Sequence, residues 1–267
     1  RGTFSLQKMN LATNMNWIGL YTLVRRDIER IFRVPTQIII SPWISALLYI
    51  FIFGYVIGGK IDLIAGVSYI SFVFPGILMM NIMSAGFSHS AFGIYFHRFA
   101  KSIEEILVAP LSYGEILLAY IIGSIFRASI VGAGIYVIAI LFGIAQVEHL
   151  GLLAFYIASV GTVFALAGMI VGLWAKSFEQ LGVVGTYVIT PLSFVGGIFY
   201  SVSMLPERVQ AITYVNPFFY FIDGLRYSMI GVSESNRLIG VIMIISLIVS
   251  LFAIVWHLLR IGWGIRT

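Results

Sequence analysis

Cysteine is missing from this chain, and charged residues are scarce. None of the 267 residues is cysteine, which excludes disulfides and thiolate metal sites. Only 10% are Asp, Glu, Lys or Arg, whereas a soluble domain carries about 25%. Hydrophobic residues make up 60% of the chain, a fraction that soluble proteins with a buried core do not reach. We therefore predict a protein whose solvent is the lipid bilayer.

Sequence patterns of catalysis, metal binding and nucleotide binding are also missing. There is no G-x-S-x-G and no H-E-x-x-H motif. The stretch GYVIGGK from Gly54 to Lys60 matches G-x-x-x-x-G-K, but Ile61 follows where magnesium binding needs Ser or Thr. We therefore expect no catalytic residues, no metal and no nucleotide site on this chain. The histidines do not cluster at metal-ligand spacing: they are His89, His97, His149 and His257.

Six segments are apolar over about 20 residues, the length that a helix needs to cross a bilayer. They cover residues 36–58, 67–92, 116–143, 150–175, 181–200 and 238–259. We therefore predict an all-α membrane protein that forms one transmembrane domain over residues 1–267. Helix-breaking residues predict kinks or broken helices at Pro75, Pro191 and Gly196-Gly197.

Lysine and arginine are distributed unevenly between the two sides of these spans. With six spans both termini lie on the same side of the membrane. That side carries eleven of the 16 basic residues, and Arg127 lies within the third span. The other side carries four: Lys60, Arg208, Arg226 and Arg237. The positive-inside rule therefore places both termini in the cytoplasm. The net charge of +5 is then a topology signal rather than a sign of nucleic-acid binding.

Residues 17–34 show the pattern of an amphipathic helix. Its apolar stripe consists of Trp17, Tyr21, Val24, Ile28 and Ile31. We predict a helix lying in the membrane interface, with cations directed at the headgroups. These cations are Arg25, Arg26, Arg30 and Arg33. The alternative is an amphipathic helix in water.

Residues 97–115 form a charged hinge between the second and third spans, so we expect them to lie in water. Apolar residues recur at helical spacing on one side: Phe99, Ile103, Ile106, Leu107 and Pro110. The charged residues lie off that side: Arg98, Lys101, Glu104 and Glu105. Because lipid does not cover this apolar face, we expect it to dock on a partner.

Residues 201–237 are too long for a simple turn between the fifth and sixth spans. Their middle is rich in aromatic residues, which would not lie free in water. We predict one or two short helices that dip back into the outer leaflet and break at Asn216-Pro217.

Arg127 and a pair of glycines stand out within the predicted spans. An ionisable group inside a membrane is a functional candidate by default. The alternative is a structural Arg127 that pairs with a carbonyl or an acid, or snorkels, and the sequence names no partner. Gly168 and Gly172 form a G-x-x-x-G pattern, which predicts close helix packing.

Four stretches together resemble one family. In chain order they are FPGILMMNIMSAG (Phe74–Gly86), KSIEEILVAP (Lys101–Pro110), TPLSFVGGIFYS (Thr190–Ser201) and NPFFYFIDGLR (Asn216–Arg226). With six spans and an amphipathic N-terminal helix, the chain resembles the membrane subunits of ABC-2-type exporters. That family includes permeases for nodulation factors, polyketide drugs and lipid-linked polysaccharides. The resemblance covers nearly the whole chain.

The resemblance implies roles for several segments. The hinge would hold a coupling helix that docks on a separate ABC ATPase, through Arg98, Phe99, Lys101, Ile103, Glu104, Glu105, Ile106, Leu107 and Pro110. The interfacial helix would flank the same ATPase. The external segment would close the pathway from outside, with the motif residues Asn216, Pro217, Tyr220, Asp223 and Arg226. The first and fifth spans would face the pathway, lined by Tyr49, Phe53, Phe194 and Phe199.

The resemblance also implies partners and a location. Two copies of the ATPase would bind ATP and Mg²⁺, so this chain would carry no cofactor. A second permease copy would complete a homodimer in the inner membrane, surrounded by lipid. The charge-poor, Met- and aromatic-rich spans suit an amphipathic or lipid-like cargo, such as a glycolipid, a lipid-linked saccharide or a hydrophobic drug.

Two other classes of protein stay open from the residues alone. A secondary transporter or channel not driven by ATP usually needs acids near the membrane midplane or paired half-helices, and the spans offer only Arg127. An intramembrane enzyme is disfavoured by the missing catalytic set. Co-purification of an ATPase favours an exporter, transport driven by an ion gradient favours a secondary transporter, and turnover by the isolated chain favours an enzyme.

Overall fold

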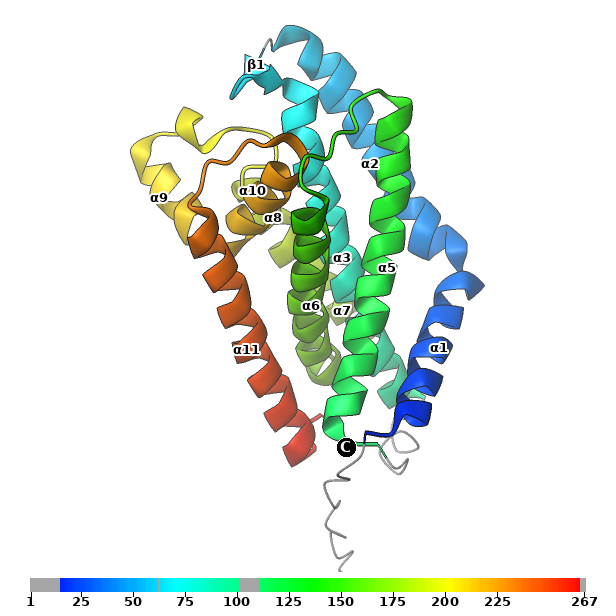
Figure 1. Ribbon diagram of the computed structural model, residues 1–267. Coiled ribbons are helices and arrows are strands. Elements are labelled where there is room, and N and C mark those ends of the chain that lie inside the picture. The colour runs from blue at the N-terminus through cyan, green and yellow to red at the C-terminus, as the bar shows by residue number, and fades with distance from the viewer. Residues whose placement is uncertain (1–14, 62, 101–110, 265–267) are drawn as a thin grey trace, which may run out of the picture.

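The computed structural model describes residues 15–61, 63–100 and 111–264, and it confirms the predicted all-α membrane fold (Figure 1). Six of its helical segments are long and apolar enough to cross a membrane. These segments are Thr36–Lys60, Tyr69–Phe99, Tyr113–Leu141, Leu150–Trp174, Phe178–Val195 and Arg237–Ile261.

The individual helices are named as in Figure 1. The α-helices are α1 (Trp17–Arg33), α2 (Ser41–Ile50), α3 (Tyr69–Phe99), α5 (Tyr113–Leu141), α6 (Leu150–Trp174), α7 (Phe178–Val184), α8 (Thr190–Val195), α9 (Glu207–Val215), α10 (Pro217–Ile230) and α11 (Arg237–Ile261). Three π-helical segments extend the first and fifth spans: η1 (Thr36–Ile40), η2 (Phe51–Ile57) and η4 (Gly185–Ile189). Two short 3₁₀ helices are η3 (Gly58–Lys60) and η5 (Val202–Met204).

The second span, α3, is the centre of the bundle. It packs against α5, α6 and α10, and 83% of its most apolar stretch is buried, compared with 17% of that in α11. Close packing on α6 depends on glycine: a Cβ atom on Gly172 would lie 2.7 Å from the Ala91 carbonyl oxygen of α3. This confirms the close packing predicted from Gly168 and Gly172.

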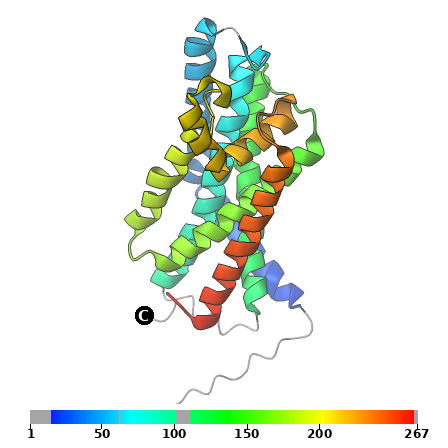
Figure 2. The ribbon, with the colours of Figure 1, turned by 90° about the vertical axis from the view of Figure 1, so that its left-hand side faces the viewer.

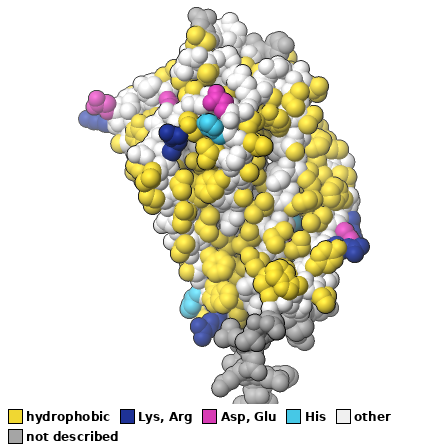
Figure 3. Space-filling view, viewed as in Figure 1, with side chains coloured by type: hydrophobic (Ala, Val, Ile, Leu, Met, Phe, Trp, Pro, Cys, Tyr) yellow, Lys and Arg dark blue, Asp and Glu magenta, His cyan; other side chains and the backbone are white. Residues whose placement is uncertain are grey.

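The outer helices expose their apolar side chains. Figure 2 shows α7 and α8 on the left flank and α11 towards the right. In Figure 3 apolar side chains cover the visible face, and charged side chains gather near the two ends and at the edge beside α1. This distribution is what a bilayer around the bundle requires.

Proline shapes the first and fifth spans in the same way. A π-helix, η1, directly precedes Ser41-Pro42, and another, η4, directly precedes Thr190-Pro191. Proline lacks an N–H and its ring crowds the carbonyl one turn back, so the helix widens instead of breaking. The Thr190 hydroxyl donates to the Gly185 carbonyl at 3.1 Å.

The predicted kinks or breaks have different outcomes. The helix is not broken at Pro75, because α3 continues through it from Tyr69 to Phe99, and a kink there stays a prediction. A break at Gly196-Gly197 is confirmed: α8 ends at Val195, and Gly197 has φ +80°, which glycine tolerates without strain.

The hinge between the second and third spans is shorter than residues 97–115. His97, Arg98 and Phe99 form the last turn of α3, and α5 already starts at Tyr113. Ser112 and Glu115 form a capping box at that start, which supplies partners for free backbone N–H groups. The sequence estimate missed both helix ends because charged residues terminate a hydrophobic run without terminating a helix.

A small hairpin that the sequence did not predict joins the first span to α3. Strand β1 (Leu63–Ile64) pairs antiparallel with β2 (Val67–Ser68). The two turn residues, Ala65 and Gly66, have φ of 50° and 82°. Two positive φ values are typical of the tight turn that joins neighbouring antiparallel strands.

Candidate functional site

Four aromatic residues from the first span, the fifth span and the segment just after it meet in the structure. The rings of Phe53 and Phe199 stack with centroids 4.1 Å apart. Tyr49 lies 6.4 Å from the Phe199 ring, and Phe194 contacts the same ring edge-on at 5.3 Å. These are the four residues that the resemblance implied as lining residues, and all are half-buried. The Tyr69 hydroxyl of α3 fixes the cluster by donating to the Phe199 carbonyl at 3.1 Å.

The surroundings of this aromatic cluster are apolar. Neither residues 36–59 nor residues 180–206 contain a charged side chain. The aromatic cluster therefore lies between two segments that offer apolar and aromatic side chains but no fixed charge.

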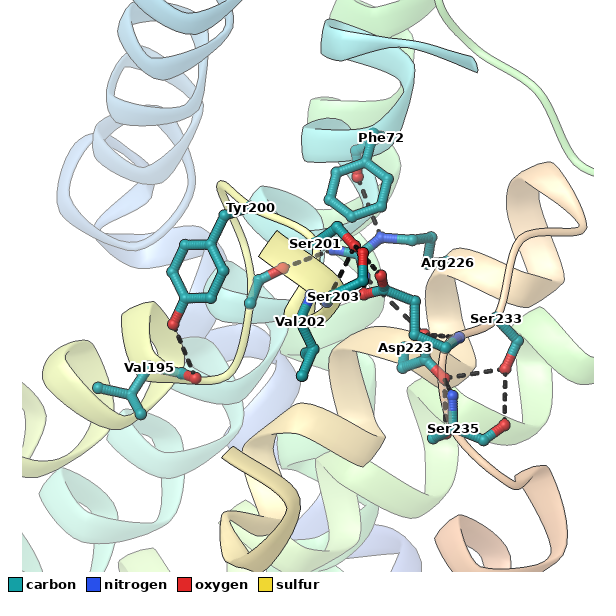
Figure 4. Close-up of polar contacts among 12 residues, drawn as sticks. Phe72, Val195, Tyr200, Ser201, Val202, Ser203, Asp223, Arg226, Ser233 and Ser235 are labelled. Atoms are coloured by element: carbon teal, nitrogen blue, oxygen red, sulfur yellow. Dashed lines mark hydrogen bonds and ion pairs between the residues drawn. The ribbon is translucent and has the colours of Figure 1, made fainter. Parts of the chain in front are cut away.

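Arg226 is the centre of a buried polar network that holds α10 (Figure 4). Its Nε donates to the Phe72 carbonyl of α3 at 3.2 Å, and its Nη2 donates to the Gly197 carbonyl at 2.6 Å. The guanidinium lies 3.8 Å from the centroid of the Phe72 ring, in cation–π geometry. One side chain therefore fastens α10 to both the second span and the end of the fifth.

Asp223 connects α10 to the loop before α11. Its carboxylate accepts hydrogen bonds from the backbone N–H groups of Glu234 and Ser235, both at 2.9 Å. The hydroxyls of Ser233 and Ser235 also donate to it, at 2.9 and 2.5 Å. Asp223 Oδ1 and Glu234 Oε2 each lie 3.9 Å from Arg226 Nη1. The buried cation is thus balanced by acids although Nη1 itself makes no hydrogen bond.

Other residues of the same motif also hold α10 in place. Asn216 caps the helix by accepting from the Phe218 N–H at 3.0 Å, and its side-chain amide donates to the Leu192 carbonyl at 2.7 Å. Pro217 follows at the first helical position, where its missing N–H is harmless. The Tyr220 hydroxyl donates to the Tyr214 carbonyl at 3.0 Å. At the end of the molecule that also carries β1 and α9, the structure thus brings all five motif residues into one anchored helix (Figure 1).

A second polar cluster lies where α1 meets α3. Asp27 of α1 is buried, and its Oδ2 lies 3.7 Å from Nε2 of the buried His89. Burial by itself raises the pKa of the Asp27 carboxyl, but the interaction with His89 and the positive charges of Arg30 and Arg26 outweigh it, so the pKa is lowered. Asp27 is therefore an anion at neutral pH.

The four arginines of α1 have different surroundings. Arg25 pairs with Glu29 at 2.8 Å in solvent, and Arg33 is exposed. Arg26 is 44% exposed and its Nη2 lies 3.1 Å from His97 Nε2. Arg30 is half-buried. The helix packs along α5, with Leu20, Asp27 and Ile31 buried, while the outer part of the predicted apolar stripe, Trp17 and Tyr21, is exposed.

Arg127 of α5 meets no acid in the described part of the chain. It is half-buried, its Nε makes no hydrogen bond, and the charge of Arg30 acts on it. The structure thus gives Arg127 a neighbour of the same sign, which the sequence could not identify.

The last residues of α3, where the hinge begins, contact two other spans. Arg98 Nη1 donates to the carbonyls of Gly172 and Ala175 at the end of α6, at 2.8 and 2.9 Å. The Phe99 ring contacts Phe178, the first residue of α7, at 5.4 Å. The remaining hinge residues of the sequence prediction lie outside the described residues: Lys101, Ile103, Glu104, Glu105, Ile106, Leu107 and Pro110.

Sequence reasoning missed three residues of these clusters: Asp27, His89 and Glu234. For Asp27 a signal existed, because residues 20, 27 and 31 fall on one face of a helix. No local pattern identified His89 or Glu234, since their partners are far along the chain.

Comparison with known proteins places these features in a family context. The family model described as "ABC-2 type transporter" matches residues 19–230. The chain is 32% identical over 254 residues to the inner membrane transport permease YadH of Escherichia coli (strain K12), covering 95% of this chain and 99% of that protein. It is 30% identical over 221 residues to Nodulation protein J of Rhizobium meliloti (strain 1021), covering 82% and 83%. Nodulation protein J of Rhizobium leguminosarum bv. viciae is 26% identical over 250 residues, covering 93% and 95%.

Proposed function

The chain belongs to the ABC-2 type transporter family, and from that premise we propose that this membrane transport subunit works in an ATP-driven exporter. A separate ATPase docks on the segment between α3 and α5 and supplies the energy. The cargo is amphipathic or lipid-like, and it moves out of the cytoplasm or the inner leaflet. A glycolipid, a lipid-linked saccharide and a hydrophobic drug share this chemistry.

The aromatic cluster of Tyr49, Phe53, Phe194 and Phe199 is the observation that carries this proposal. Ring contacts connect the first span to Phe199, just beyond the fifth span, and Phe199 to Phe194 within it, in segments without a charged residue. A pathway for ions needs polar or charged groups to replace water. Ring contacts, in contrast, separate at modest cost when an apolar group takes their place.

The contacts of Arg98 and Phe99, at the end of α3 where the hinge begins, support a mechanical connection from the ATPase to the spans. Arg98 ties the end of α3 to α6, and Phe99 ties it to Phe178 at the start of the fifth span. A partner that displaces the hinge therefore moves the segment that carries Phe194 at its other end. The spans have at least two arrangements in equilibrium. ATP can shift this equilibrium only by the difference in the affinity of the ATP-bound ATPase for the two arrangements.

The working complex contains two ATPases and two permeases. A second copy of this chain completes a homodimer in the inner membrane, with both termini in the cytoplasm, and ATP and Mg²⁺ bind to the ATPases. Relatives named inner membrane transport permease support this location.

The experiment that tests the proposal is co-purification of the chain with its ATPase, followed by ATP hydrolysis in proteoliposomes. Leu107→Asp or Glu105→Arg should abolish stimulation of hydrolysis by the permease while leaving membrane insertion unchanged. The control is Glu207→Arg, an exposed acid on α9, which should leave stimulation unchanged. A chain that purifies alone and transports with an ion gradient would overturn the proposal and indicate a secondary transporter.

A further inference from the structure

The loop that carries Phe199 is held by contacts from distant parts of the chain. This Phe199 loop, residues 196–201, lies between α8 and η5 and forms turns and bends rather than a helix or strand. Its position therefore depends on side chains from other elements. Phe199 is also the ring that the other three members of the aromatic cluster contact. Residues that fix this loop therefore fix the centre of the cluster.

Two of the contacts that hold the Phe199 loop come from helices. At its start the Gly197 carbonyl accepts from Nη2 of Arg226 in α10 at 2.6 Å. In its middle the Phe199 carbonyl accepts from the hydroxyl of Tyr69, the first residue of α3, at 3.1 Å. Arg226 and Tyr69 are both buried, and their helices pack against each other. These two donors therefore keep a fixed position relative to the bundle.

The end of the Phe199 loop is held by Glu234 instead. Its Oε1 accepts from the Ser201 hydroxyl, and its Oε2 accepts from the Val202 N–H at 3.2 Å. Oε2 also lies 3.9 Å from Nη1 of Arg226, so Ser201 and Val202 lie next to the Arg226 network (Figure 4). Ser201 and Val202 are buried, and the Glu234 side chain is only 13% exposed. One carboxylate thus supplies the acceptors for two buried donors, which would be costly to leave unpaired.

Glu234 differs from the two helical donors because it lies in a loop itself. Residues 231–236 join α10 to α11 without forming a helix, and they start at Gly231, which has φ +69°. Such connecting segments open at a lower free energy than packed helices do. The contacts of Glu234 with Ser201 and Val202 can therefore break while α3 and α10 keep their places. They are the contacts most easily released when the aromatic cluster separates.

We propose that Glu234 is the positioning residue that keeps the aromatic cluster closed, because it holds the end of the Phe199 loop through Ser201 and Val202. When the segment between α10 and α11 moves away, Glu234 releases the loop end and the Phe199 ring leaves the cluster. The inference rests on the proposed function in one respect: a closed cluster restricts a pathway only if the first and fifth spans border one.

The first test is a double-mutant cycle of thermal unfolding in detergent. In the wild-type background the melting-temperature shifts of Phe53→Ala and Phe199→Ala should not add, because the two rings stack. In the Glu234→Ala background this deviation from additivity should fall to about half or less, because the Phe199 ring is no longer held against Phe53. The matched control is Glu207→Ala, an exposed acid on α9, which should leave the deviation unchanged.

The cycle separates positioning from stability. If Glu234 only stabilised the fold, Glu234→Ala would lower the melting temperature and leave the ring coupling intact, and this result would overturn the proposal. Two milder variants give the same answer if Glu234→Ala folds poorly. Glu234→Gln keeps one acceptor oxygen, and Ser201→Ala removes one of the two donors. Both should reduce the coupling in part, and full coupling in both would contradict the proposal.

The second test measures the position of the loop end by electron–electron resonance between two spin labels. The chain has no cysteine, so labels can be attached through Val56→Cys in the first span and Met204→Cys in η5, both at exposed side chains. Chains labelled at one position only identify distances between copies. Glu234→Ala should add a population at longer distance, whereas Glu207→Ala should keep the wild-type distribution. An unchanged distribution in Glu234→Ala would refute the release of the loop.

Neither test needs an ATPase or a cargo, so the two proposals fail separately. A chain that purifies without an ATPase would overturn the proposed exporter and leave the measured release of the Phe199 loop in place. Intact ring coupling and an unchanged label distance in Glu234→Ala would overturn the role of Glu234 and leave the exporter standing.

Discussion

Removing the Asp223 carboxylate should detach α10 from the loop that precedes α11. In Asp223→Ala the backbone N–H groups of Glu234 and Ser235 lose their acceptor. Each buried group left without a partner costs about 1–3 kcal/mol. The fully buried Arg226 also loses one of its two nearby acids.

The size of the effect follows from what remains. Breaking a buried ion pair costs about 3–5 kcal/mol. Glu234 Oε2 stays 3.9 Å from Arg226 Nη1, and the hydrogen bonds from Arg226 to Phe72 and Gly197 are unaffected. We therefore expect Asp223→Ala to lower the free energy of unfolding by about 3 kcal/mol, the lower end of this range. That loss corresponds to a fall in melting temperature of about 6–12 °C for a chain of this size.

Thermal unfolding of the purified chain in detergent measures this change. Asp223→Asn keeps one carbonyl oxygen as an acceptor, so it should fall between wild type and Asp223→Ala. The control is Glu207→Ala, which removes an exposed acid from α9 and should leave the melting temperature unchanged. If Asp223→Ala melts at the same temperature as Glu207→Ala, the network does not stabilise α10 and the reasoning fails.

Three further predictions concern packing, pH and the aromatic cluster. Gly168→Leu should lower the melting temperature strongly, because a side chain there overlaps the α3 backbone at the Phe87 carbonyl oxygen. The free energy of unfolding should fall as the pH drops below about 4, because the lowered pKa of Asp27 stabilises the folded chain only while the carboxylate is charged. The Asp27→Asn variant should lose this dependence. Phe53→Ala and Phe199→Ala should be coupled by about 0.5–1.5 kcal/mol in a double-mutant cycle of unfolding, because the rings stack.

Each of these predictions has a matched control on the same element. Gly151→Leu in α6 faces open space and should leave the melting temperature near wild type. Glu29→Gln in α1 removes an exposed acid and should keep the pH dependence. Ile52→Ala, at a side chain that is 43% exposed, should show no coupling to Phe199→Ala. Equal effects of a variant and its control would contradict the packing, charge or stacking argument concerned.

The two polar clusters lie on opposite parts of α3. Phe72 near its start receives Arg226, while His89 further along meets Asp27. Because α3 is the most buried span, a polar contact made on it is shielded from water and strengthened. This gives a physical reason why α1 and α10, which are not spans, are both attached to the central helix.

The sequence by itself determined the number of spans and much of the local structure. An apolar run of about 20 residues needs no tertiary information to be identified as a span, and Gly168 with Gly172 predicts close packing by the same local logic. It also contained the four stretches that resemble the family. The predicted helix ends at the hinge were wrong, because the charged residues there begin before α3 ends. The start of α5 is marked instead by the capping box at Ser112.

Only the tertiary structure decided which of these residues meet. Arg226 reaches Phe72 across 154 positions of sequence, and Phe53 of the first span stacks on Phe199, which follows the fifth span. Asp27 meets His89 only because α1 packs against the spans, which no local periodicity specifies.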